Sequence, residues 1–325
     1  MLKIVLVLLA FFAVSLAYGQ TDSLTREERL ALDSMFKNDE FIKMMMAKEK
    51  SYFDVNIGIG NGIFSLKNNA LNAGLSVTNK IFYTPTIGYY HKSGFAITAT
   101  AHVTDDEGSL KMYRYAISPS YVYTDKNIDV GVSYTRFIDG SSTSFEISPF
   151  KNDLYGGIVF KKTWIEPGIA LGYSSGKELE YFDTSFWVLN RIVHIRDTIT
   201  TRLNAFSLII SATHKWDLFD LLSKKDALRL QPILFLNSGS LNWNTTHSNR
   251  LNNRLPRVQD YLKNRFGNGS GNSSFKVQSL AFLGEITYYY GKFYLQPEIY
   301  LDYYLPSTTE KRLTTLFSVV AGFTF

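Results

Sequence analysis

The chain has 325 residues, 45% of them hydrophobic and 15% aromatic, with a mean hydropathy of -0.07 and a formal net charge of +5. This hydropathy is not that of a helical membrane protein, and no stretch beyond the N-terminus reaches the roughly 20 apolar residues of a spanning helix. The absence of cysteine excludes disulfides, thiolate metal sites and a lipid anchor on an N-terminal cysteine. The isoelectric point near 9.0 could indicate nucleic acid, but no basic helix or aromatic-basic stripe supports that partner.

Residues 1–19 are typical of a secretory signal peptide. Lys3 supplies the positive charge, residues 4–16 form the apolar stretch, and the small residues of Ala17-Tyr18-Gly19 precede a cleavage site. The apolar stretch is too short for a comfortable transmembrane helix. We therefore expect export of the mature chain.

Residues 20–50 predict a short N-terminal helical segment, which begins with a capping box at Thr25 and Glu28. We expect this segment on the periplasmic side, either at the mouth of the domain that follows or as a plug inside it. Docking of a periplasmic partner is the alternative.

From Tyr52 onward, apolar and polar residues alternate, and a period of two predicts β-strands. The cleanest case is Phe293–Leu305, with an apolar face opposite a face that carries Glu298 and Asp302. In Tyr113–Thr124 the apolar face is expected to start with Tyr113. About twelve strands are expected, at Tyr52–Gly60, Ile81–Tyr90, Phe95–Thr104, Tyr113–Thr124, Ile128–Phe137, Leu154–Lys161, Trp164–Ser174, Ala205–Trp216, Leu228–Asn237, Val277–Tyr290, Phe293–Leu305 and Arg312–Phe325.

The connections between these strands sort by length. If the first strand runs outward, the long segments 61–79, 138–153, 176–203 and 240–275 all fall on one side, as loops, together with the shorter links 105–111 and 306–311. The links 91–94, 125–127, 162–163, 217–227 and 291–292 fall on the other side. Long extracellular loops with short periplasmic turns are typical of outer-membrane barrels.

The last strand places Phe323 and the terminal Phe325 on one apolar face. This ending resembles the C-terminal signal of Gram-negative outer-membrane β-barrel proteins, which end in an aromatic residue, usually Phe. The resemblance implies an all-β, transmembrane, antiparallel up-and-down β-barrel over residues 51–325. It also implies insertion by the barrel-assembly machinery and contact with outer-membrane lipid and lipopolysaccharide. The alternative is the closing strand of a soluble sandwich.

Charged residues on the polar faces are candidates to line the lumen, and both signs are present. They are Arg114, Asp129, Lys161, Glu166, Lys215, Arg229, Glu285, Glu298 and Asp302. One interpretation is an ion-pair network that braces a narrow lumen. The other is a charge-lined constriction that selects solutes. The first functional hypothesis is therefore a porin-like passage for small solutes, and the second is a non-conducting barrel that acts through its loops or a periplasmic partner.

The third hypothesis is a lipid-modifying enzyme. His91-Lys92-Ser93 is similar to the His-x-Ser of outer-membrane phospholipases, which are also twelve-stranded barrels. However, we expect this pair in a periplasmic turn, and an orienting group near Thr104 or Asp105 would lie on the order of 30 Å away. No metal-ligand spacing or phosphate-binding loop appears. We therefore expect no enzyme, no metal and no cofactor.

Overall fold

The computed structural model describes residues 50–61, 80–142, 148–188, 191–223, 225–249, 270–306 and 312–325. The predicted signal peptide and the predicted helical segment lie outside the described residues. No helix in the described ranges is long and apolar enough to cross a membrane.

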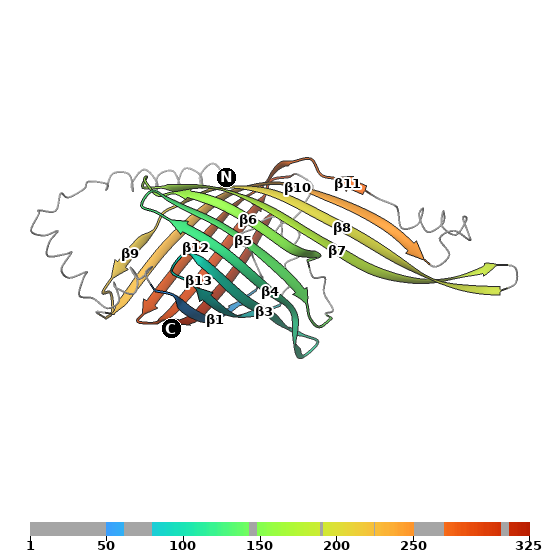
Figure 1. The fold of residues 1–325 in the computed structure, drawn as a ribbon, viewed down its shortest axis with the longest axis horizontal. Helices are drawn as coiled ribbons and strands as arrows, with labels where there is room; N and C mark the ends of the chain where they lie inside the picture. The colour runs from blue at the N-terminus through green and yellow to red at the C-terminus, as the bar shows by residue number, and fades with distance from the viewer. Residues whose placement is uncertain are drawn as a thin grey trace, which may run out of the picture. The chain divides into compact units, whose positions relative to one another are not determined.

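Twelve antiparallel strands form a closed barrel, which confirms the predicted number (Figure 1). Each strand pairs with the next along the chain, β1 also pairs with β14, and the pairing of β8 with β10 completes the ring. The barrel strands are β1 Tyr52–Gly60, β2 Phe82–Tyr90, β3 Phe95–Asp106, β4 Ser109–Thr124, β5 Ile128–Asp139, β6 Phe150–Phe160, β7 Glu166–Val188, β8 Arg191–Thr213, β10 Asp226–Asn249, β12 Lys276–Tyr290, β13 Phe293–Tyr304 and β14 Leu313–Thr324. Two short strands, β9 (Trp216–Phe219) and β11 (Ser270–Asn272), pair with the ends of β10.

The outer surface of the barrel is apolar. In β1, for example, Val55, Ile57 and Ile59 are exposed, whereas Asp54, Gly58 and Gly60 on the opposite face are buried. A closed barrel satisfies its backbone groups between strands and leaves no free edge, as a bilayer requires. An apolar exterior on such a barrel is the architecture of the Gram-negative outer membrane, and the protein is located there.

One end of the barrel has short turns, and the other has the long connections. Gly94 (φ 94°) and Gly291 (φ 58°) occupy left-handed positions in two of the short turns. The C-terminus lies at the same end, because Phe325 N donates to Phe53 O at 2.8 Å. We assign this end to the periplasm, since short turns face it in outer-membrane barrels.

The prediction that residues 176–203 form a loop is wrong. β7 and β8 continue through this segment as a long hairpin that projects from the barrel, and β10 accompanies them as far as Asn249 (Figure 1). The projecting part is held by the pairing of Asp183 with Arg196 and by a 3.0 Å hydrogen bond between Thr201 and Thr245. Outside the membrane neither face needs to be apolar, so the alternation that marks the other strands is lost. In the predicted loop 240–275, β10 and β11 occupy the described ends.

The predicted outward face of Tyr113 is also wrong. A β-bulge lies opposite His102 and Val103. His102 pairs with Arg114 and Val103 pairs with Met112, so Tyr113 is an extra residue of β4 with no partner position in β3. The bulge inverts the parity of β4 at this point. Tyr113 and Arg114 therefore both point inward, and Tyr113 is only 4% exposed.

Candidate functional site

The inner wall of the barrel has two chemically different halves. On the parts of β2, β3 and β4 nearer the short turns, the inward residues are mainly small and hydroxylated, and solvent reaches them partly, whereas Phe82, His102 and Tyr113 further along these strands are buried. The hydroxylated residues include Thr86, Thr98, Thr100, Ser118 and Ser120. Thr86 and Thr100 share a hydrogen bond of 2.9 Å, and Ser118 bonds Thr135 of β5 at 2.8 Å. These bonds hold the hydroxyls in fixed positions along the wall.

The opposite half, from β7 to β14, carries a packed apolar cluster. Leu283 and Tyr300 are cross-strand neighbours, and they are 0% and 1% exposed. The cluster consists of Ala170, Ile209, Phe235, Ala281, Leu283, Tyr300 and Leu316. Inward side chains with so little exposure do not face a wide aqueous lumen, so water is excluded from the wall at this cluster.

Five of the predicted lumen charges on one side of the barrel take part in three ion pairs near the periplasmic end. Lys161 Nζ lies 2.9 Å from Asp129, and Lys215 Nζ lies 3.1 Å from Glu166. Arg229 donates hydrogen bonds to both carboxylate oxygens of Asp217, at 2.7 and 3.2 Å. Asp217 was missed, because residues 217–227 were predicted to be only a link, whereas β9 places this carboxylate opposite Arg229.

Glu285 and Glu298 form a cross-strand pair of carboxylates on the inner wall. Both are half-buried. Glu298 accepts hydrogen bonds of 2.6 Å from Ser318 Oγ and from Gln296 Nε2, while Glu285 lies opposite Gln231 in β10. Two carboxylates on directly opposite positions of neighbouring strands attract cations to the inner wall.

Arg114 is a buried cross-link of the wall. Its guanidinium donates to the carbonyl oxygens of Ser148 and Phe150, and it lies 3.5 Å from Asp139. His102, its neighbour on β3, is 8% exposed, and within the described ranges neither ring nitrogen has a hydrogen-bond partner. Asp302 is also buried, and its Oδ1 has no hydrogen-bond partner among the residues that the structure describes.

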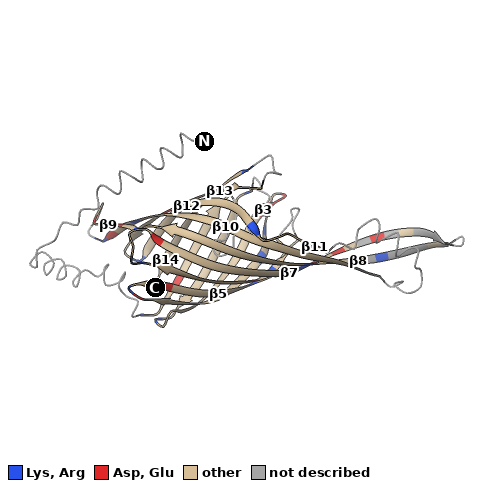
Figure 2. Cartoon of the chain, turned by 90° about the horizontal axis from the view of Figure 1, so that it is seen from above, with Lys and Arg blue, Asp and Glu red and all other residues tan. Residues whose placement is uncertain are grey.

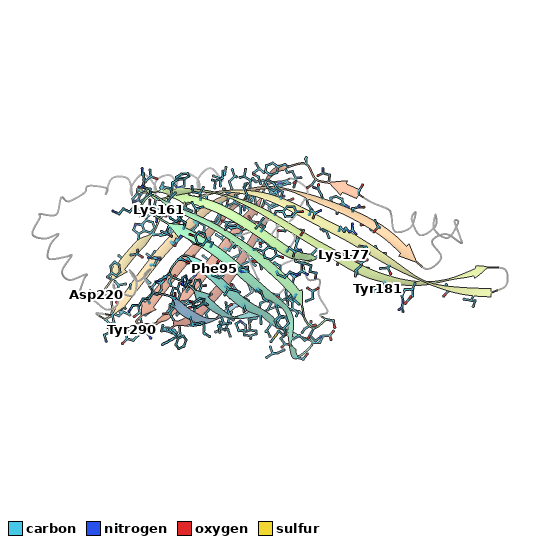
Figure 3. All side chains as sticks on the ribbon, viewed as in Figure 1. Phe95, Lys161, Lys177, Tyr181, Asp220 and Tyr290 are labelled. Atoms are coloured by element: carbon cyan, nitrogen blue, oxygen red, sulfur yellow. The ribbon has the colours of Figure 1, made fainter. Side chains whose placement is uncertain are left out.

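Seven of the nine predicted lumen residues lie in strands, on the face opposite to the exposed apolar side chains. The other two, Lys161 and Lys215, lie in the connections that follow β6 and β8. Lys, Arg, Asp and Glu are few along the barrel strands, which carry mostly uncharged residues (Figure 2). Figure 3 places Lys161 at the short-turn end of the barrel. That these residues line a passage for solutes stays a prediction.

The His-x-Ser sequence forms a local turn. His91 Nδ1 lies 2.8 Å from Ser93 Oγ, and both side chains belong to the short connection between β2 and β3. A hydrolytic serine needs a histidine that a third group orients. Among the residues that the structure describes, the His91 side chain has no carboxylate partner, and no cluster of three potential metal ligands occurs.

No family model matches the chain, and no curated protein matches it. Solved structures with a similar arrangement are outer-membrane barrels. The NanC porin has a TM-score of 0.36 and 10% identity, with 83% of this chain and 98% of that chain covered. The outer-membrane channel DcaP of Acinetobacter baumannii has a TM-score of 0.24 and 7% identity, with 85% and 96% covered. OmpT, an outer-membrane protein of Vibrio cholerae, has a TM-score of 0.20 and 8% identity, with 85% and 97% covered.

Proposed function

We propose that this barrel is a narrow, porin-like passage for small polar solutes, which runs along the hydroxyl-lined half of its inner wall. The supporting observation is the unequal exposure of the two halves. Thr86 and Thr100 are partly exposed, whereas Leu283 and Tyr300 are almost completely buried. Water beside the hydroxyl groups leaves room for an eccentric path, and hydroxyl groups can replace part of the hydration of a solute.

The path also has a charge. Glu285 and Glu298 are partly exposed on the opposite wall, in the same two strands as Leu283 and Tyr300, so their negative potential acts on the path from across the lumen. The ion pairs of Lys161, Lys215 and Arg229 neutralise the cations nearer the periplasm. We therefore expect a preference for cations over anions. The proposal involves no catalytic step.

Substituted cysteines test this path, because the chain has no cysteine of its own. Thr100→Cys would place a thiol on the hydroxyl wall, and Leu283→Cys would place one inside the apolar cluster. In planar bilayers, a charged thiol reagent should reduce the single-channel current of Thr100→Cys and leave that of Leu283→Cys unchanged. Ala99→Cys is the matched control, since Ala99 is the exposed, lipid-facing neighbour of Thr100.

Absence of conductance from the correctly folded protein would contradict a passage. A second candidate would then be favoured, namely a non-conducting barrel that acts through its extracellular surface. The observation that favours it is the projecting hairpin, since β7 and β8 each have 23 residues and a tilted spanning strand needs only about 9–11. Deletion of residues 178–200 should abolish the function of such a barrel and leave its heat-modifiable folding unchanged.

We further propose that the C-terminal Phe323 and Phe325 serve as an assembly signal. Their rings lie 4.9 Å apart, and both are exposed on the apolar face at the periplasmic end. That position makes them accessible to assembly machinery on the periplasmic side. Deletion of Phe325 should lower the amount of folded barrel in the outer membrane, as measured by heat-modifiable migration, and Phe325→Tyr should not.

A further inference from the structure

On the outer surface of β5 to β8, one polar register row interrupts the apolar band. The last complete apolar row consists of the cross-strand neighbours Tyr134, Leu154, Tyr173 and Phe206. Two residues further out on each strand, the same face carries Arg136, Asn152, Ser175 and Asn204, which are again cross-strand neighbours. Beyond this row Ile138 and Leu179 are again exposed, but a polar row aligned across four strands is where headgroups of the outer leaflet can replace hydrocarbon.

Hydrogen bonds fix this polar row. Asn152 Oδ1 accepts from Arg136 Nη1 at 2.6 Å and from the hydroxyl of Tyr134 at 2.8 Å. Asn152 Nδ2 donates to Ser175 Oγ at 3.3 Å, and the Tyr173 hydroxyl donates to Asn204 at 3.1 Å. The guanidinium of Arg136 is therefore held in place on the outer surface, next to the lipid-facing rings.

The next outward positions on β7 and β8 are both cationic. Lys177 and Arg202 are direct cross-strand neighbours, and both are exposed. Figure 3 places Lys177 where β7 leaves the barrel. Like charges directly opposite each other destabilise a sheet. In the described part of the chain, neither residue has a carboxylate partner, although Arg196 further out is paired with Asp183.

We propose that Arg136, Lys177 and Arg202 bind the phosphate groups of an outer-leaflet lipid headgroup, in effect lipopolysaccharide. The cations lie on the face that continues the lipid-facing band, so an anion bound there can extend acyl chains over Leu154 and Phe206. Arg136 lies two strands from Lys177, on the order of 10 Å along the sheet. That spacing suits a headgroup with two phosphates, and charge-assisted bonds from arginine and lysine are the usual way to hold them.

The test measures binding of diphosphorylated lipid A to the intact, detergent-solubilised protein by native mass spectrometry at fixed salt. The double variant Lys177→Gln/Arg202→Gln should bind about 30-fold more weakly, because each Lys or Arg near an anionic lipid contributes about 1 kcal/mol to the binding free energy. Arg136→Gln should give a smaller loss. Arg196→Gln is the matched control, since it removes an exposed charge from the same hairpin and should leave the affinity unchanged.

Three results would overturn the proposal. Equal affinity of the double variant and the unaltered protein would exclude these cations, and an equal loss in Arg196→Gln would indicate unspecific charge attraction. Displacement of lipid A by inorganic phosphate at the same phosphate concentration would indicate a site for free anions instead of lipid. Heat-modifiable migration of each variant confirms that the barrel is folded, so loss of binding reports on the site.

Discussion

Tyr294 of β13 reaches across Gly322 of β14 and donates a hydrogen bond to Asp54 of β1. The hydroxyl lies 3.1 Å from Asp54 Oδ2. A Cβ at position 322 would stand 2.3 Å from Tyr294 Cζ, so only glycine leaves room for the phenol. One side chain thus connects the penultimate strand to the first strand, over the strand between them, at the seam where the barrel closes.

Gly322→Ala should therefore weaken closure of the barrel. The added methyl group forces the Tyr294 ring away from Asp54, and overpacking of this kind costs about 1–3 kcal/mol. Urea unfolding in detergent measures the loss. Gly156→Ala is the control, because the nearest atom to its Cβ would lie at 3.8 Å. In the Tyr294→Ala background the effect of Gly322→Ala should disappear, and an undiminished loss there would show that the ring is not the cause.

Leu283→Ala should destabilise the barrel strongly. The Leu283 side chain is completely buried against Tyr300, and removal of a core leucine costs about 2–5 kcal/mol. Leu280→Ala, on the lipid-facing side of the same strand, should cost less than about 1 kcal/mol, because detergent fills the space. The same two variants test the narrow passage, since only Leu283→Ala should raise the conductance.

Arg114→Gln should lower the free energy of unfolding by about 3 kcal/mol, because it leaves the carbonyl oxygens of Ser148 and Phe150 without their charged donor. Lys151→Gln is the matched control, since Lys151 contacts the same Asp139 from a more exposed position. Lys151→Gln should lower the free energy of unfolding by no more than about 1 kcal/mol. Equal losses in urea unfolding would mean that Arg114 acts only through Asp139.

The strands inside the membrane could be predicted because two environments act on them. Lipid on one side and water or polar wall on the other impose alternation, as in Phe293–Leu305. The projecting part of β7 and β8 has water on both sides, so neither face had to be apolar and no period-two signal remained. The bulge at Tyr113 was missed for another reason. One extra residue in a strand moves the following side chains to the other face, and the types of residue in the sequence do not show where this happens.

The candidate site could be predicted only in its polar part. The charges Lys161, Lys215 and Arg229 stood out in the sequence, but their partners depend on register, which single strands do not reveal. The residues of the apolar cluster interrupt the alternation of apolar and polar residues. Leu316, for example, is an apolar residue on the polar face of β14, and it is buried in the cluster. Apolar residues at strand positions that point into the barrel were therefore the signal in the sequence from which the apolar cluster could have been predicted.

The projecting hairpin should show a pH-sensitive contact between Asp183 and Arg196. The hydrogen bond from Arg196, at 2.8 Å, lowers the pKa of Asp183 below its ordinary value. Because the pKa of Asp183 is lowered in the folded hairpin, the contact stabilises the hairpin at pH values above the ordinary carboxyl pKa. This stabilisation is lost as the pH falls through the lowered pKa of Asp183. In an NMR titration of the carboxyl carbon, Arg196→Gln should raise the pKa of Asp183, and Arg202→Gln should leave it unchanged. An unaltered pKa in Arg196→Gln would assign the shift to another group.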